Sequence, residues 1–209
     1  MKPEIIDYAP IEPKSLSSTP RWNLTLKLGK DIMNKHFNNW QLGFGTLLGA
    51  VRNGTVIPHD IDLDIDLILY QTEEDKIPIF RKEMLDNNFI MLREQKFKYI
   101  DNILIMSLAF KHKITGVIFD VCIFRKFGTD FLHIGKEGMV IRPSWTEKKR
   151  IIKIKEEDYF VPKRAEDYLT GRYGNWKIPC SNKGHWYKDA AKGNLFIPIN
   201  FEAKIRKKY

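Results

Sequence analysis

The stretch that decides the fold is residues 43–67, GFGTLLGAVRNGTVIPHDIDLDIDL. Its second half alternates aspartate with isoleucine or leucine, which is typical of a β-strand because side chains two residues apart point to the same face. One face is therefore expected to be acidic, and it would carry Asp60, Asp62, Asp64 and Asp66. The other face is expected to pack on the core, and it would carry Ile61, Leu63, Ile65 and Leu67.

The acidic face predicts a metal site. Like charges this close raise one another's pKa unless a cation is present, and no Lys or Arg occurs between Arg52 and Lys76. Two aspartates at one strand end can hold one divalent cation, or two about 4 Å apart, beside a phosphoryl group. A solvated edge strand that carries acids against strand pairing is the open alternative. A calcium-binding loop is disfavoured because its sixth position, normally Gly, is Ile65 here.

A third acid, Asp120, stands alone inside the apolar run VIFDVCIF. A carboxylate in such a strand is costly unless it is paired or bound to a metal. If this strand lies next to the acidic one, Asp120 joins the same metal centre. The alternative is a buried salt bridge or a position at a strand end.

The glycine segment before the acids predicts a phosphate-binding turn. Gly43 and Gly45 would lie at a strand-to-helix turn, where backbone N–H groups and the helix dipole favour an anion. Thr46 could cap the helix or contact a phosphate oxygen, and Arg52 is placed to reach a diphosphate. A plain tight turn is the alternative explanation of the two glycines.

The order of the elements predicts an α+β domain with a mixed sheet flanked by helices. Helices are expected over residues 20–36, 46–54, 72–88 and 163–174, and strands over 40–44, 60–70, 90–93, 103–112 and 116–124. The first 20 residues hold four prolines and predict an extended arm. Residues 21–125 would form the catalytic core, and residues 126–209 a smaller mixed C-terminal part that binds the acceptor.

The composition and the charge of the chain indicate its cellular compartment and the kind of partner that it binds. The formal charge of +9 indicates a polyanionic partner, a phosphorylated substrate or an anionic membrane surface. Cys122 and Cys180 do not make a disulfide framework. The first residues show no apolar core of signal-peptide length, and no apolar run in the sequence is as long as a membrane span. We therefore expect a cytoplasmic protein that contacts a membrane, if at all, from that side. The basic end, FEAKIRKKY, is expected to be a solvated tail.

These features together resemble the nucleotidyltransferase fold and, more narrowly, the LicD/fukutin family. GTLLGAVRNGTVIPHDIDLDIDL is similar to the family signature, and YLTGRYGNWKIP (168–179) resembles a downstream family segment. His59 stands where the family usually has Trp, and Asp66 extends the alternation beyond the usual pattern. A lone histidine is more often structural than catalytic, so no chemistry is assigned to His59. Asp66 would be a further metal contact or the solvent end of the strand.

The resemblance implies transfer of a phosphorylated alcohol, such as phosphocholine, glycerol phosphate or ribitol phosphate, from a CDP-linked donor to a glycan. Asp62 and Asp64 match the metal-binding pair, and Asp120 the third carboxylate. The residues that match the donor-phosphate side are Gly45, Thr46 and Arg52. We expect two ions, Mg²⁺ or Mn²⁺, and an acceptor hydroxyl oriented by Asp120. Asp60 matches a preceding acid of unclear role.

Three other functions stay open. A nucleotidyltransferase proper would move a nucleotide from NTP to a small molecule, a protein or RNA with the same acids, although Gly45-Thr46 replaces the usual Gly-Ser. A sugar transferase with an Asp-x-Asp metal motif would need a nucleotide-binding segment upstream, and few residues precede Gly43. A non-catalytic homologue would keep the fold alone. We do not expect nucleic acid as the main partner.

Overall fold

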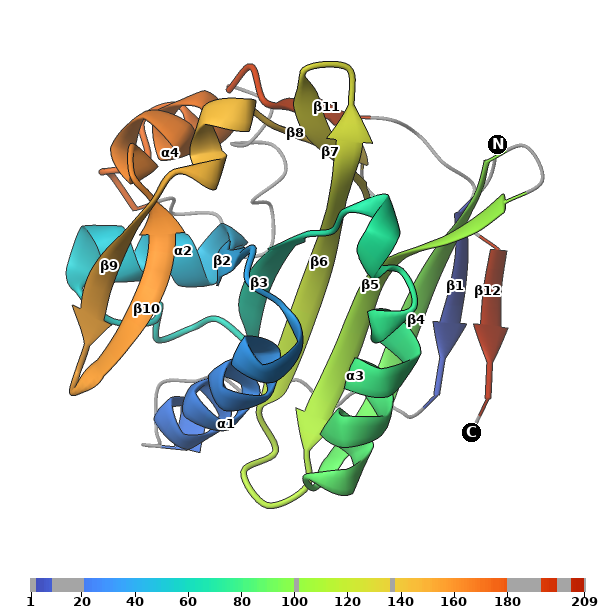
Figure 1. The fold of residues 1–209 in the computed structure, drawn as a ribbon. Coiled ribbons are helices and arrows are strands. Elements are labelled where there is room, and N and C mark those ends of the chain that lie inside the picture. Colours follow the sequence, from blue (N-terminus) through green and yellow to red (C-terminus); the bar gives the residue numbers. More distant parts are fainter. Residues whose placement is uncertain are drawn as a thin grey trace.

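The computed structural model describes residues 3–8, 21–99, 102–135, 138–179, 193–198 and 204–208. Within them the chain forms a ten-stranded mixed sheet, a two-stranded hairpin and four α-helices (Figure 1). The helices are α1 (Arg21–His36), α2 (Phe44–Asn53), α3 (Lys76–Asp86) and α4 (Ala165–Tyr173). The strands are β1 (Pro3–Asp7), β2 (Trp40–Leu42), β3 (Asp62–Ile68), β4 (Phe89–Tyr99), β5 (Asn102–His112), β6 (Ile118–Phe127), β7 (Asp130–Ile134), β8 (Gly138–Arg142), β9 (Lys149–Ile154), β10 (Glu157–Pro162), β11 (Phe196–Pro198) and β12 (Lys204–Lys207).

The α+β class is confirmed, and the expected elements up to residue 125 all occur in the expected order. Helix α2 ends at Gly54, whose φ of 68° is the left-handed conformation that glycine adopts without strain. Helix α4 likewise follows Pro162 and ends before Gly174. The strands β7 to β10 were missed, because their sequences are short and mix charged with apolar residues.

Strand β6 is the centre of the sheet. Its first part pairs in parallel with β3, and β2 pairs with the far side of β3. Its opposite edge pairs with β5, and its last residues, Arg125–Phe127, pair with β7. The sheet then continues through β7, β8 and β11, so strands beyond the expected boundary at residue 126 belong to the same sheet as the core. The division of the chain into domains stays a prediction.

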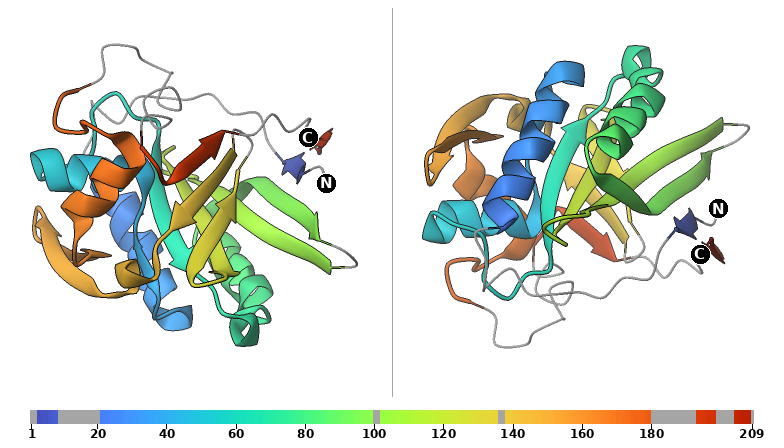
Figure 2. Two further views of the ribbon diagram at one scale, coloured as in Figure 1. Left: turned by 90° about the horizontal axis from the view of Figure 1, so that it is seen from above. Right: turned by 90° about the horizontal axis from the view of Figure 1, so that it is seen from below.

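The two faces of β3 have different surroundings. Leu63, Ile65 and Leu67 are fully buried in the main core, on the face that α1 and α3 cover side by side (Figure 2). The acidic residues lie on the other face, as the alternation predicts. Ile61 departs from the prediction because it precedes β3, and its side chain is 39% exposed.

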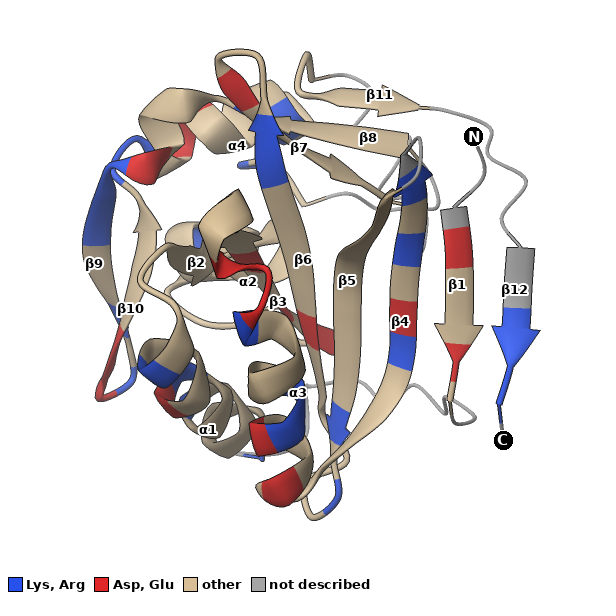
Figure 3. Cartoon of the chain, turned by 45° about the vertical axis from the view of Figure 1, so that its right-hand side comes forward, with Lys and Arg blue, Asp and Glu red and all other residues tan. Residues whose placement is uncertain are grey.

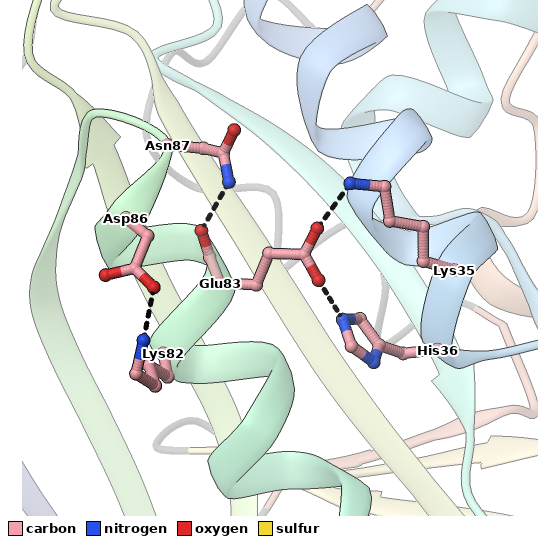
Figure 4. Close-up of polar contacts among 6 residues, drawn as sticks. All are labelled: Lys35, His36, Lys82, Glu83, Asp86 and Asn87. Carbon is pink, nitrogen blue, oxygen red and sulfur yellow. Dashed lines mark hydrogen bonds and ion pairs between the residues drawn. The ribbon is translucent and has the colours of Figure 1, made fainter.

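Helices α1 and α3 are joined at one end by Glu83 of α3. Its carboxylate accepts a hydrogen bond from Lys35 and lies at hydrogen-bond distance from the ring of His36, both in the last turn of α1 (Figure 4). Phe37 and Phe80 pack edge to face beside this contact, with ring centroids 5.5 Å apart. The helix layer behind the acidic strand is thus held by both polar and aromatic contacts.

The two ends of the chain meet at one edge of the sheet. Strand β1 pairs with β4, and β12 pairs in parallel with β1. The described part of the expected arm is therefore a strand, and residues 9–20 lie outside the described residues. The backbone of Lys204–Lys207 pairs with the sheet, whereas Arg206, Lys207 and Lys208 are exposed to solvent, as expected of a solvated end. Strand β12 and the distant β9 are both strongly basic (Figure 3). Among the described residues, no helix is both long and apolar enough to cross a membrane.

Candidate metal centre on the acidic face

Three carboxylates gather where β3 begins. Asp62 and Asp64 lie on β3, and Asp60 lies just before it. One carboxylate oxygen from each of the three acids lies within 4.8 Å of those of the other two, and all three side chains are partly buried. The expected pair Asp62 and Asp64 is therefore brought together with Asp60, an acid that had no predicted role.

Burial raises the pKa values of all three acids, and at Asp62 and Asp64 the charges of neighbouring acids raise them further. Burial, followed by the charges of Asp60 and Asp120, raises the pKa of Asp62 to about 8. Burial and the charge of Asp62 raise the pKa of Asp64 well above its usual range. Burial also raises the pKa of Asp60. In the absence of a cation Asp62, with a pKa of about 8, would hold a proton near neutral pH, and a divalent cation could take the place of that proton.

The donor set fits a hard divalent cation. All the ligand atoms are carboxylate oxygens, which suit Mg²⁺ or Mn²⁺ better than a soft metal. The ion pairs of the described residues involve Asp66 and Asp120 but leave Asp60, Asp62 and Asp64 out. Within the described part of the chain, no cationic side chain forms an ion pair with these three acids, and their partial exposure leaves room for substrate or water ligands.

The glycine turn holds Asp64 rather than leaving its N–H groups open. The N–H of Gly43 donates to the carbonyl of Asp64 (2.9 Å), and the N–H of Gly45 donates to its Oδ2 (3.0 Å). The N–H of Asp64 donates to Oγ1 of Thr46 (2.8 Å). Thr46 is buried and does not cap α2, whose N-cap is Gly43. Gly45 and Thr46 thus fix the backbone and side chain of Asp64.

Both glycines are also required by the acids that lie against them. A Cβ at Gly45 would come within 2.2 Å of Oδ2 of Asp60, and a Cβ at Gly43 within 2.1 Å of Oδ1 of Asp66. Any larger residue would therefore displace a carboxylate. This close approach explains the two glycines without reference to a phosphate.

Arg52 lies at the opposite end of α2 from the glycine turn. It is in the last turn, where its side chain donates to Asn53 (2.8 Å) and to the carbonyl of Trp176 (3.4 Å). The structure thus places Arg52 beside the chain that follows α4, and its contact with a donor phosphate stays a prediction.

Asp120 lies beside the three acids, but it has its own partner. Asp120 is the register partner of Asp64 on the adjoining strand, as expected if the strands were neighbours. It is 5% exposed and forms an ion pair with Arg93 of β4. Asp120 therefore matches the alternative of a buried salt bridge, on a strand next to the clustered acids, and its part in a metal centre stays a prediction. Arg93 was missed, since nothing near it in the sequence links it to Asp120.

Asp66 is not the solvent end of the strand, so that expectation was wrong, and its pairing with an arginine argues against a further metal contact. It is 1% exposed and forms an ion pair with Arg142 of β8, which is fully buried. A second nitrogen of Arg142 donates to Oε1 of Gln41 on β2 (2.8 Å). Burial raises the pKa of Asp66 to about 6, and the charge of Arg142 opposes the rise. The fourth alternating acid thus links β3, β2 and β8.

The family model LicD/FKTN/FKRP, nucleotidyltransferase domain, matches residues 39–166, more than half of the chain. The chain belongs to this family. The match includes the glycine turn, the acidic strand, Arg93, Asp120 and Arg142. Comparison with curated proteins gave no match. Family membership supports a transferase role of the phosphotransferase type that acts on glycans.

Asp62→Asn should change how stability depends on pH. In the absence of divalent cations, the wild type takes up a proton on folding between the ordinary pKa of aspartate, about 4, and the folded value of about 8. The contribution of Asp62 to the free energy of unfolding of the wild type therefore falls as the pH rises through that range, by at most about 1.4 kcal/mol per pH unit. The variant lacks this loss, so its stability relative to wild type should increase from pH 5 to pH 8.

Urea unfolding of both proteins in EDTA at pH 5, 6.5 and 8 measures this difference. Saturating Mn²⁺ should make the wild type more stable than Asp62→Asn at pH 8, because the wild type has one more carboxylate ligand for the cation. A constant difference across the three pH values in EDTA would contradict the raised pKa of Asp62.

Arg142→Met should destabilise the fold by about 3–5 kcal/mol, because it leaves Asp66 buried without its counter-charge. The loss should shrink at lower pH, since Asp66 can then take up a proton. Urea unfolding at pH 5 and pH 8 checks both effects. The double variant Asp66→Asn/Arg142→Met is the control, and it should recover part of the loss because neither charge remains. Equal instability of the single and double variants would count against the pair as the cause.

Proposed function

We propose that the protein transfers a phosphorylated alcohol from a CDP-linked donor to a hydroxyl of a glycan or glycoconjugate. Candidate groups are phosphocholine, glycerol phosphate and ribitol phosphate. The proposal is carried by the cluster of Asp60, Asp62 and Asp64 with Asp120 at its side, in a chain of the LicD/FKTN/FKRP family. The net charge of +9 suits anionic substrates.

The three clustered acids would hold Mg²⁺ or Mn²⁺. When bound, the cation would neutralise the acids and draw charge from the donor's diphosphate. Gly45 and Thr46 keep Asp64 in position for this role through the hydrogen bonds to its side chain and backbone. Arg52 is proposed to contact the donor on the side away from the acids. Much of the catalytic effect would come from this positioning and charge balance.

Asp120 would act on the acceptor. The acceptor oxygen attacks the phosphorus nearer the transferred alcohol, its proton passes to Asp120, and the bond from that phosphorus to the bridging oxygen breaks. CMP leaves with the electron pair of that bond. Oδ1 of Asp120 is proposed for this task because it has no hydrogen-bond partner among the described residues, whereas Oδ2 is bonded to Arg93.

Transfer of a nucleotide from NTP is the second candidate. It is favoured by the description of the matching family model as a nucleotidyltransferase domain. The two candidates break different bonds, because one releases CMP from a CDP-alcohol and the other releases pyrophosphate from NTP. Incubation with CDP-choline, CDP-glycerol, CDP-ribitol and labelled NTPs in the presence of Mn²⁺ separates them. Release of pyrophosphate without release of CMP would replace our proposal by the second candidate.

Asp64→Asn should lower turnover by about 10²-fold or more while the fold survives, because the cation and the charge balance are lost together. Release of CMP from the CDP-alcohol that the wild type accepts is the measurement, and circular dichroism checks the fold. Glu166→Gln, an exposed acid of α4 that pairs with Arg150, is the control and should keep wild-type turnover. Wild-type turnover in Asp64→Asn would refute the assignment.

Gly45→Ala should weaken Mn²⁺ binding by about 10–100-fold, as loss of a group that orients a metal ligand commonly does. The added methyl group would displace Asp60 and disturb the bond from Gly45 to Asp64. Gly54→Ala at the other end of α2 is the matched control, because a Cβ there meets no atom within 4 Å. It should cost about 1 kcal/mol of stability through its positive φ and leave Mn²⁺ affinity unchanged, as titration calorimetry can show. Equal Mn²⁺ affinity in the two variants would argue against the steric role of Gly45.

A further inference from the structure

A single row of residues runs across four strands of the acidic face. Asp64 on β3 pairs with Asp120 on β6, Asp120 pairs with Ala109 on β5, and Ala109 pairs with Arg93 on β4. Residues paired in register point to the same face of a sheet. Ala109 lies between Arg93 and Asp120 in this row, and its side chain is only a methyl group. The long side chain of Arg93 can therefore cross β5 and reach Asp120.

The contact between Arg93 and Asp120 is one-sided. The guanidinium donates through one terminal nitrogen to Oδ2 of Asp120, while Nε of Arg93 and Oδ1 of Asp120 are buried and bond to none of the residues that the structure describes. The pair leaves 30% of the Arg93 side chain and 8% of the Asp120 side chain exposed. The charge of Arg93 also acts on Asp62, which links the arginine to the metal acids.

Asp120 does not belong to the cluster whose oxygens lie within 4.8 Å of one another; in the described part of the chain, that cluster is Asp60, Asp62 and Asp64. A second cation between Asp62 and Asp120 would lie next to a guanidinium already bonded to Asp120, and like charges in a partly buried site repel. The sequence-based expectation of two cations that share Asp120 therefore conflicts with Arg93.

We propose that Arg93 supplies at Asp120 the positive charge that a second divalent cation would supply, so that the centre holds one cation, on Asp60, Asp62 and Asp64. The proposal deepens the proposed metal-dependent function and rests on it. Arg93 is a positioning residue, since it acts through Asp120 and leaves Oδ1 of that acid for the acceptor hydroxyl.

The number of bound Mn²⁺ ions tests the proposal independently of the donor. The wild type should bind one Mn²⁺ by titration calorimetry, and its electron paramagnetic resonance spectrum should be that of an isolated ion, with and without added CDP. Arg93→Gln should bind a second Mn²⁺ and give the spectrum of a coupled pair, because two-metal sites hold their ions about 3.5–4 Å apart. Arg93→Gln/Asp120→Asn should return to one ion.

Three variants separate this role from a purely structural salt bridge. Arg93→Lys keeps the charge and should bind one ion. Ala109→Leu keeps both charged residues but blocks the path between them, so it should bind two. Arg81→Gln is the matched control, because Arg81 pairs with Glu94, a buried acid that directly follows Arg93 and points to the opposite face of β4. It removes the same charge and should bind one ion.

A coupled pair in the wild type, or a single ion in Arg93→Gln, would overturn the proposal. The number of Mn²⁺ ions bound by the wild type tests the proposal even where a variant fails to fold. The same measurements distinguish failure of this proposal from failure of the proposed transfer reaction. A protein that binds one Mn²⁺ but releases no CMP from any CDP-alcohol would refute the transfer reaction and leave the role of Arg93 intact.

Discussion

Repulsion among five carboxylates is the constraint on which this side of the molecule depends. Asp60, Asp62, Asp64, Asp66 and Asp120 lie on or beside two paired strands. The fold meets this repulsion in a different way at each position. Arg142 balances Asp66, Arg93 balances Asp120, and the backbone of the glycine turn supports Asp64. The charge that remains is concentrated on the three acids that form the candidate metal centre.

Local sequence was sufficient for the elements between residues 20 and 125 and for the position of the acids. The alternation of residues 60–67 predicted a strand with one acidic face, and the apolar run around Asp120 predicted a neighbouring strand. Both predictions rest on side-chain periodicity, which is encoded within a few residues. The glycine turn was also located correctly, although its N–H group at Gly45 serves Asp64 and its lack of side chains makes room for Asp60 and Asp66.

The partners of the acids could not be predicted in the same way. Arg93 and Arg142 reach their acids across strands that are distant in sequence, and their own surroundings carry no motif. Only the pairing order of the sheet brings them together. Asp66 shows the consequence most clearly, because its place in the alternation suggested a metal ligand while its actual partner comes from β8, in the part of the chain that was hardest to interpret.

The link between Asp66 and Arg142 also bears on the C-terminal part of the chain. Arg142 joins β8 to β3 and, through Gln41, to β2. The amide of Gln41 in turn donates to the carbonyl of Thr146 (2.7 Å), just before the β9–β10 hairpin. The segments proposed to recognise the acceptor are therefore tied to the same strand that carries the metal acids.

The irregular pairing of β4 decides which charge meets the aspartates. Met91 pairs with Phe110 and Arg93 pairs with Ala109, so Leu92 is an extra residue in β4 at this point. Met91 packs against the main core, whereas Arg93, two residues later, faces the acids and Glu94 faces α3. Strict alternation would place Met91 and Arg93 on the same face and would turn Glu94 toward the aspartates. The charge balance of the acidic face thus depends on a bulge at an uncharged residue.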